Sequence, residues 1–208
     1  MTGFAAPRCA GLILAGGRGA RLQHIIKANL LLGGQRYLDR VAARLSACRP
    51  LLVATGPYGP DRLPLPPGLL AIPDPGPAFA GPVAGLAAAV AFLACRAPDT
   101  RFLLTAAVDA PCLPADFYPR LSASIGDRPA AFAASAGQPH PTHALWRLDA
   151  LAGLPAALAA GTAPTSLRRL AADPVLVDWP VGPAGDPFTN ANTPEDLLLL
   201  ARRDINSR

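Results

Sequence analysis

The stretch "LILAGGRGARLQHIIKANLLL" (residues 12–32) begins as an apolar run and is then interrupted by glycines and by Arg18, Arg21 and Lys27. Its first residues predict a buried strand that ends at Ala15. Three cations so close together are not expected in a hydrophobic core, whereas they suit the binding of a polyanion. The stretch therefore predicts a strand that leads into a loop for an anionic ligand.

The same alternation of short apolar runs and alanine-rich helical patterns continues along the chain. Strands are predicted over 11–15, 50–54, 69–72, 102–106, 130–134 and 175–178. Helices are predicted over 37–47, 82–94, 115–124, 149–159, 165–171 and 194–203. Such alternation is typical of βαβ units, so we expect one α/β domain over residues 1–208, with a mostly parallel sheet and helices on both faces.

Composition narrows the class of protein further. Of 208 residues, 51% are hydrophobic and 16% are charged, which indicates a globular chain rather than a disordered one. Lys and Arg (19) outnumber Asp and Glu (14), a net charge of +5 that favours anionic partners or reflects a basic proteome. There is no block of consecutive basic residues, so nucleic acid is not an expected partner.

The cysteines and the apolar segments indicate the compartment. The four cysteines show no C-x-x-C pair and no zinc-ligand spacing, so we expect free thiols in a reducing cytoplasm. The N-terminus lacks the pattern of a signal peptide, and the apolar segment 82–95 is too short to span a bilayer. We therefore expect a soluble cytoplasmic protein without a membrane partner.

The glycine loop itself suits phosphate. Gly16, Gly17 and Gly19 follow the first strand, where glycine lets backbone N–H groups approach phosphate oxygens. Arg21 can add forked hydrogen bonds and Lys27 a mobile point charge. The spacing fits neither a Walker A loop nor a dinucleotide fingerprint, and structural turns also use glycine.

A carboxylate follows another predicted strand. In "FLLTAAVDAPCLP" (residues 102–114), Asp109 is the only acidic residue and stands just beyond the apolar run. A carboxylate facing a basic phosphate loop suits Mg²⁺ held jointly by protein and phosphates. The alternative is that Asp109 caps a turn before Pro111.

A polar segment opens the last predicted helix. In "NANTPEDL" (residues 190–197), Thr193 is the expected N-cap. Glu195 and Asp196 complement the helix dipole, which explains them without a functional role. The two asparagines have no such explanation.

Two further segments carry polar side chains. Asp74 follows a strand and could accept hydrogen bonds from a nucleobase edge, and Gly81 begins a helix. We place "GQPHPTHALW" (residues 137–146) in a loop, where His140 and His143 have too few companions for a metal site.

Taken in order, these motifs resemble one family, the molybdenum cofactor guanylyltransferases. The resemblance runs over nearly the whole chain and rests on LAGG (14–17), Arg21, Lys27, GGQRYL (33–38), GPVAGL (81–86), Asp109-Ala-Pro, HPTHALW (140–146) and NANTPED (190–196). LAGG alone is weakly specific, but its combination with GPVAGL and NANTPED is strong.

The resemblance implies a three-layer, Rossmann-like nucleotidyltransferase fold. It implies that GTP and molybdopterin-bound molybdenum give the guanine dinucleotide cofactor and pyrophosphate, with Mg²⁺ on the triphosphate and a recipient molybdoenzyme as a possible partner. The nucleotide half would be about 8–115 and the pterin half about 116–208.

The resemblance also implies roles for single residues. Lys27, Arg21 and Asp109 would be catalytic, with Asp109 as the metal ligand. The GTP side would be formed by Leu14, Ala15, Gly16, Gly17, Lys27, Asp74, Gly81 and Asp109. The pterin side would be formed by Asn190, Asn192 and His140.

The chain departs from the family pattern at several places. Gln23 replaces a glycine, Ile26 replaces the aspartate beside the lysine, Val108 replaces a cysteine, and Ala54 stands where an asparagine is expected. Two alternatives stay open: a sugar-1-phosphate nucleotidyltransferase, and a catalytically weak carrier or chaperone of the molybdenum cofactor. Acceptance of CTP beside GTP also stays open.

Overall fold

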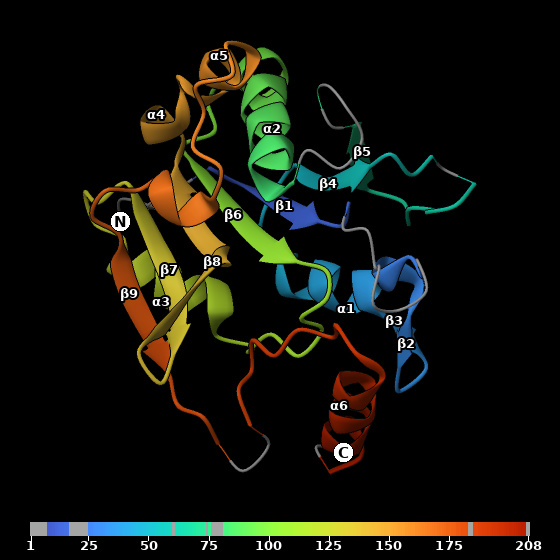
Figure 1. Cartoon of the computed structure of the whole chain (residues 1–208). Helices are drawn as coiled ribbons and strands as arrows, with labels where there is room; N and C mark the ends of the chain where they lie inside the picture. Colours follow the sequence, from blue (N-terminus) through green and yellow to red (C-terminus); the bar gives the residue numbers. More distant parts are fainter. Residues whose placement is uncertain are drawn as a thin grey trace, which may run out of the picture.

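The alternating pattern folds into one mixed sheet. The computed structural model describes residues 8–16, 25–59, 61–73, 75, 81–182 and 185–206 (Figure 1). Its seven-stranded sheet has the order β5-β4-β1-β6-β8-β7-β9. The strands are β1 (Cys9–Leu14), β4 (Leu51–Gly56), β5 (Leu69–Pro73), β6 (Phe102–Ala107), β7 (Ala130–Ser135), β8 (Gln138–Arg147) and β9 (Val175–Trp179). The predicted α/β class is confirmed.

Strand β8 corrects the expectation of a loop over residues 137–146. It pairs antiparallel with β6 and with β7, whereas the other pairings of this sheet are parallel. Its sequence contains two prolines, which ordinarily indicate a loop because proline cannot donate to the ladder. Opposite β7, Phe132 pairs with Ala144 and Ala133 with His140, so residues 141–143 bulge out of the ladder. The bulge accommodates a proline in a central strand.

Helices cover both faces of the sheet (Figure 1). On one face α1 (Tyr37–Arg44) and α3 (Phe117–Ser124) pack over a core that includes Ile13, Leu38 and Leu121. On the other face α2 (Pro82–Arg96), α4 (Leu148–Leu151) and α5 (Leu154–Ala159) pack over Leu12, Leu86 and Trp146. Consecutive residues of β1 thus enter opposite cores, as expected for a strand buried on both faces.

Two predicted helices are shorter than expected. The helix over 149–159 is divided into α4 and α5, because Gly153 and Pro155 stand where it would have continued. The helix over 165–171 is only a 3₁₀ turn, η3 (Leu167–Arg169).

The C-terminal helix returns to the start of the chain. Helix α6 (Pro194–Asn206) contacts β2 (Leu31–Leu32), which forms a small hairpin with β3 (Gln35–Arg36) just after η2 (Lys27–Asn29) (Figure 1). Leu200 is fully buried and anchors α6 in the core. Residues from the two ends of the chain are therefore neighbours. Among the helices in these ranges, none is long and apolar enough to cross a lipid bilayer.

Candidate active site

A cavity of about 360 Å³ lies where parallel strands end. Leu14 and Ala107, the last residues of β1 and β6, lie at its wall with Ala54 of β4. Ligands of parallel sheets bind at this edge because loops diverge there and leave a crevice. Its full lining is Leu14, Ala15, Gly16, Lys27, Ala54, Gly81, Pro82, Gly85, Ala107, Val108, Asp109, Thr142 and Asn190.

Gly16 lets the loop after β1 meet the end of β4 at the cavity wall. A Cβ on Gly16 would lie 2.9 Å from the Cα of Gly56, which itself has φ +59°. The opposing atoms are backbone rather than the flexible end of a side chain, so they cannot move aside easily. The first glycine of the loop therefore has a packing reason in addition to any role toward phosphate.

Lys27 and Asp109 form the charged centre of the site. Lys27 Nζ donates to Asp109 Oδ2 at 2.8 Å, and the two side chains are 12% and 20% exposed. Lys27 Nζ also donates to Asn192 Oδ1 at 2.5 Å. The fold thus joins a cation, a carboxylate and an amide from three separate segments.

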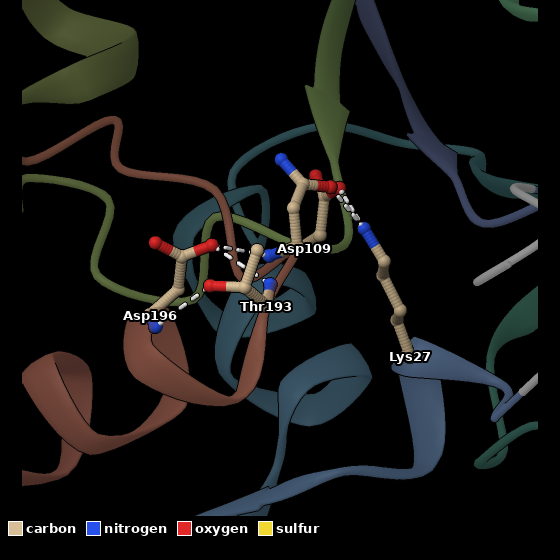
Figure 2. A network of polar contacts seen from close by, with 5 residues as sticks. Lys27, Asp109, Thr193 and Asp196 are labelled. Carbon is tan, nitrogen blue, oxygen red and sulfur yellow. Dashed lines mark hydrogen bonds and ion pairs between the residues drawn. The ribbon is translucent and has the colours of Figure 1, made fainter. Parts of the chain in front are cut away.

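The segment after residue 190 is attached to Asp109 through its backbone. Ala191 N–H donates to the carbonyl of Asp109 at 2.7 Å. The carboxylate of Asp196 then accepts the N–H groups of Asn192 and Thr193, and the Thr193 hydroxyl accepts the N–H of Asp196 (Figure 2). Thr193 is the helix cap, as predicted.

The N-terminus of α2 forms another wall. Gly81 has φ +84°, a conformation that favours glycine, and Pro82 occupies the first helical position. The first-turn N–H groups of a helix are unpaired donors that suit anions. Both residues line the cavity together with Gly85.

Some predicted site residues lie outside the described residues. These are Gly17, Arg21 and Asp74, together with Arg18 and Gly19 of the same loop and the departure at Gln23. Their assigned roles stay predictions.

The polar residues of β8 lie in different surroundings. Thr142, in the bulge, lines the cavity and was missed by sequence reasoning, because no local sequence pattern specifies the bulge. His140 is not among the described lining residues; its Nε2 lies 2.7 Å from Ser135 Oγ and 3.6 Å from Asp186 Oδ2. Burial lowers the pKa of His140, and Asp186 opposes this.

His143 points into the aromatic core instead. It is 1% exposed, with its ring 6.3 Å from Phe117 and 5.5 Å from Phe188, measured between centroids. Neither ring nitrogen has a hydrogen-bond partner in the described structure. Burial, with a smaller effect of His140, lowers the pKa of His143 to about 3. His143 is therefore a neutral core residue.

Known sequences identify the family. Residues 11–175 match the model of the MobA-like NTP transferase domain. The chain belongs to this family. It is 38% identical to the molybdenum cofactor guanylyltransferase of Rhodopseudomonas palustris strain BisB5, over 94% of each chain. It is also 38% identical to that of Bradyrhizobium sp. strain ORS 278, over 97% of this chain and 96% of the relative.

Solved structures agree on the fold of this MobA-like domain. Molybdopterin-guanine dinucleotide biosynthesis protein A from Archaeoglobus fulgidus has a TM-score of 0.66 at 22% identity, over 95% of this chain and 98% of that one. The 4-diphosphocytidyl-2C-methyl-D-erythritol synthase from Anaerococcus prevotii has a TM-score of 0.71 at 12% identity, over 96% of each. The chain is a nucleotidyltransferase by its sequence family, and it shares its fold with these structures.

Proposed function

We propose that this nucleotidyltransferase moves GMP from GTP to molybdenum-bound molybdopterin, forming molybdopterin guanine dinucleotide and pyrophosphate. The observation that carries the proposal is the cavity at the sheet edge, with Lys27 and Asp109 in its wall. The relatives at 38% identity are named for this reaction and align over almost the entire chain.

The chemical step is an in-line displacement. An oxygen of the terminal pterin phosphate forms a bond to the α-phosphorus of GTP, and the bond from that phosphorus to the bridging oxygen breaks. Negative charge moves toward the leaving pyrophosphate. Lys27 stabilises that charge, because a fixed cation gains more in the transition state than in the ground state.

The side chains near Asp109 fit a Mg²⁺ ion held mainly by substrate. Within the described ranges no group of three or more His, Cys, Asp or Glu side chains could hold a metal by itself. One carboxylate plus phosphate oxygens is a usual Mg²⁺ arrangement, and Asp109 is the carboxylate at the cavity. When bound, the ion would neutralise triphosphate charge.

The two halves of the chain supply different walls. The strands and Lys27 come from residues before 115, which we assign to GTP. Thr142 and Asn190 come from the later half, which we assign to the pterin. Asp74 stays our candidate for reading guanine, because its carboxylate can accept from N1–H and the exocyclic amine.

Incubation with molybdenum-loaded molybdopterin, Mg²⁺ and each of the four nucleoside triphosphates tests the proposal. We expect pyrophosphate and a dinucleotide product with GTP, and the same assay reports any use of CTP. Asp109→Asn should abolish turnover while the protein stays folded, since an amide binds a hard cation poorly. Tight binding of GTP and pterin without pyrophosphate release would instead support the carrier alternative.

A further inference from the structure

The first turn of α6 is linked to the active site by one carboxylate. Asp196 Oδ2 accepts the N–H of Thr193 at 2.8 Å and the N–H of Asn192 at 2.9 Å. In return Thr193 Oγ1 accepts the N–H of Asp196 at 3.2 Å. A reciprocal cap of this kind normally satisfies only the helix end. Here the same carboxylate also holds the residue before the cap.

The residue before the cap, Asn192, contacts Lys27 directly. Asn192 presents its side-chain oxygen to Lys27 Nζ, and the neighbouring Ala191 N–H holds the carbonyl of Asp109. Asp196 is therefore connected to the ammonium group through the backbone and the side chain of Asn192. Figure 2 shows Asp196 and Thr193 on one side of this network and Lys27 on the other.

The hydrogen bonds also act on the Asp196 carboxylate itself. Its pKa lies below the ordinary value, chiefly because of the bond from the Asn192 N–H, with Thr193 and Lys27 adding smaller effects. The ionised form is thus the one that the loop around residue 192 stabilises. Glu195, the residue before Asp196, carries the same charge and is exposed. It therefore supplies the same helix-dipole effect without these hydrogen bonds.

We propose that Asp196 is a positioning residue that fixes Asn192 and thereby aims the Lys27 ammonium at its working place in the cavity. The consequence for catalysis rests on the proposed function, whereas the placement of Lys27 does not. A cation that stabilises developing charge must be held in place before the reaction, so a loosened Asn192 affects turnover more than nucleotide binding.

Lys27 is the only lysine in the chain, which permits a direct measurement. Protein labelled with isotope in lysine alone gives a single side-chain NMR signal, that of Lys27. We expect Asp196→Ala and Asn192→Ala to move this signal in the same direction. Glu195→Ala, the matched loss of charge, should leave it in place.

Kinetics with GTP and molybdopterin complete the test. Asp196→Ala should lower kcat by about tenfold and change the KM for GTP by less than about threefold. Asp196→Asn, which keeps an acceptor oxygen, should recover most of the loss. In an Asn192→Ala background, Asp196→Ala should have little further effect, because both act on one interaction. If Asp196→Ala does not fold, Asp196→Leu, which is close in size and has no acceptor oxygen, supplies the same cycle.

The outcomes separate the two proposals. An unmoved lysine signal in Asp196→Ala, or effects of Asp196 and Asn192 that add fully, would overturn the positioning role. If the variants show the expected signal changes but the wild-type protein forms no dinucleotide, the proposed function is overturned and the positioning of Lys27 stands.

Discussion

At the scale of single residues, the site depends on a cation whose partners come from far along the chain. Lys27 contacts Asp109, 82 positions away, and Asn192, 165 positions away. Ile26 beside it replaces the acidic residue of the family pattern and is buried. The partners of Lys27 are therefore brought to it by the fold and are not its neighbours in the sequence.

Lys27→Ala should lower kcat/KM by about two decades, of order 3 kcal/mol in transition-state stabilisation. We expect this loss because, in the proposed reaction, the Lys27 ammonium stabilises the charge that develops on the leaving pyrophosphate. Steady-state kinetics with GTP and molybdopterin measure this, with Arg21→Ala expected to cost less and mainly through KM. Near-wild-type turnover in Lys27→Ala would remove the lysine from the mechanism.

His143 predicts a pH-dependent stability. Burial lowers the pKa of His143 to about 3 in the folded protein. In the unfolded chain the same side chain has a pKa of about 6.5, so below that pH the unfolded chain binds a proton that the folded protein does not bind. Stability is therefore full above about pH 6.5 and falls by about 1.4 kcal/mol per pH unit as pH decreases toward the folded pKa.

Urea unfolding at about pH 7.5 and about pH 5 should show a loss of about 2 kcal/mol through this residue. In His143→Leu, which keeps an apolar side chain between Phe117 and Phe188, that part of the loss should vanish. An equal loss in both proteins would show that other groups cause it.

At the scale of elements, two glycines let the loop after β1 approach the end of β4 closely. Gly16 and Gly56 approach so closely that a Cβ on either would contact the other's Cα at 2.9 Å. This approach shapes the wall that Leu14 and Ala54 share. The close approach of two glycines from separate segments thus contributes to the shape of this wall.

Gly16→Ala should destabilise the protein by about 1–3 kcal/mol and weaken GTP binding, because backbone must shift to admit the methyl group. Gly59→Ala is the control, since a Cβ there meets no described atom within 4 Å. We expect it to change stability by no more than about 1 kcal/mol. Equal melting temperatures and nucleotide affinities for the two variants would contradict the packing role.

At the scale of the whole molecule, the sheet is joined where β6 meets the reversed strand β8. Buried Thr105 accepts the indole N–H of Trp146 at 3.1 Å and donates to the carbonyl of Ala144 at 3.2 Å. These two hydrogen bonds join β6, in the half that we assign to GTP, to β8 in the later half. The cavity takes lining residues from both sides of that junction.

Thr105→Val should cost about 1–3 kcal/mol of unfolding free energy, because the shape is kept while the Trp146 N–H loses its buried partner. Thr105→Ser keeps the hydroxyl and should cost clearly less. Chemical unfolding of both variants measures the difference. If the two variants lose the same stability, packing rather than the hydrogen bond accounts for the position.

The local features of this protein were predictable from its sequence. Apolar runs predicted β1, β4 and β6, and their alternation with helical patterns predicted the α/β class, since strand burial leaves a compositional trace. Lys27 and Asp109 were recognisable because each is a charged residue next to a predicted strand end or phosphate loop. Thr193, at the opening of the last predicted helix, indicated the cap of α6.

The contacts between segments far apart in the sequence became known only from the fold. Strand β8 was invisible because its prolines indicate a loop, and the pairing with β6 and β7 outweighs that local preference. Burial of His143 and entry of Thr142 into the cavity follow from one bulge, which no local pattern specifies. From the sequence, Asp196 is explained by the helix dipole alone, whereas in the structure it is connected to Lys27 through Asn192. Contacts between distant segments depend on the path of the whole chain, and local sequence carries no record of that path.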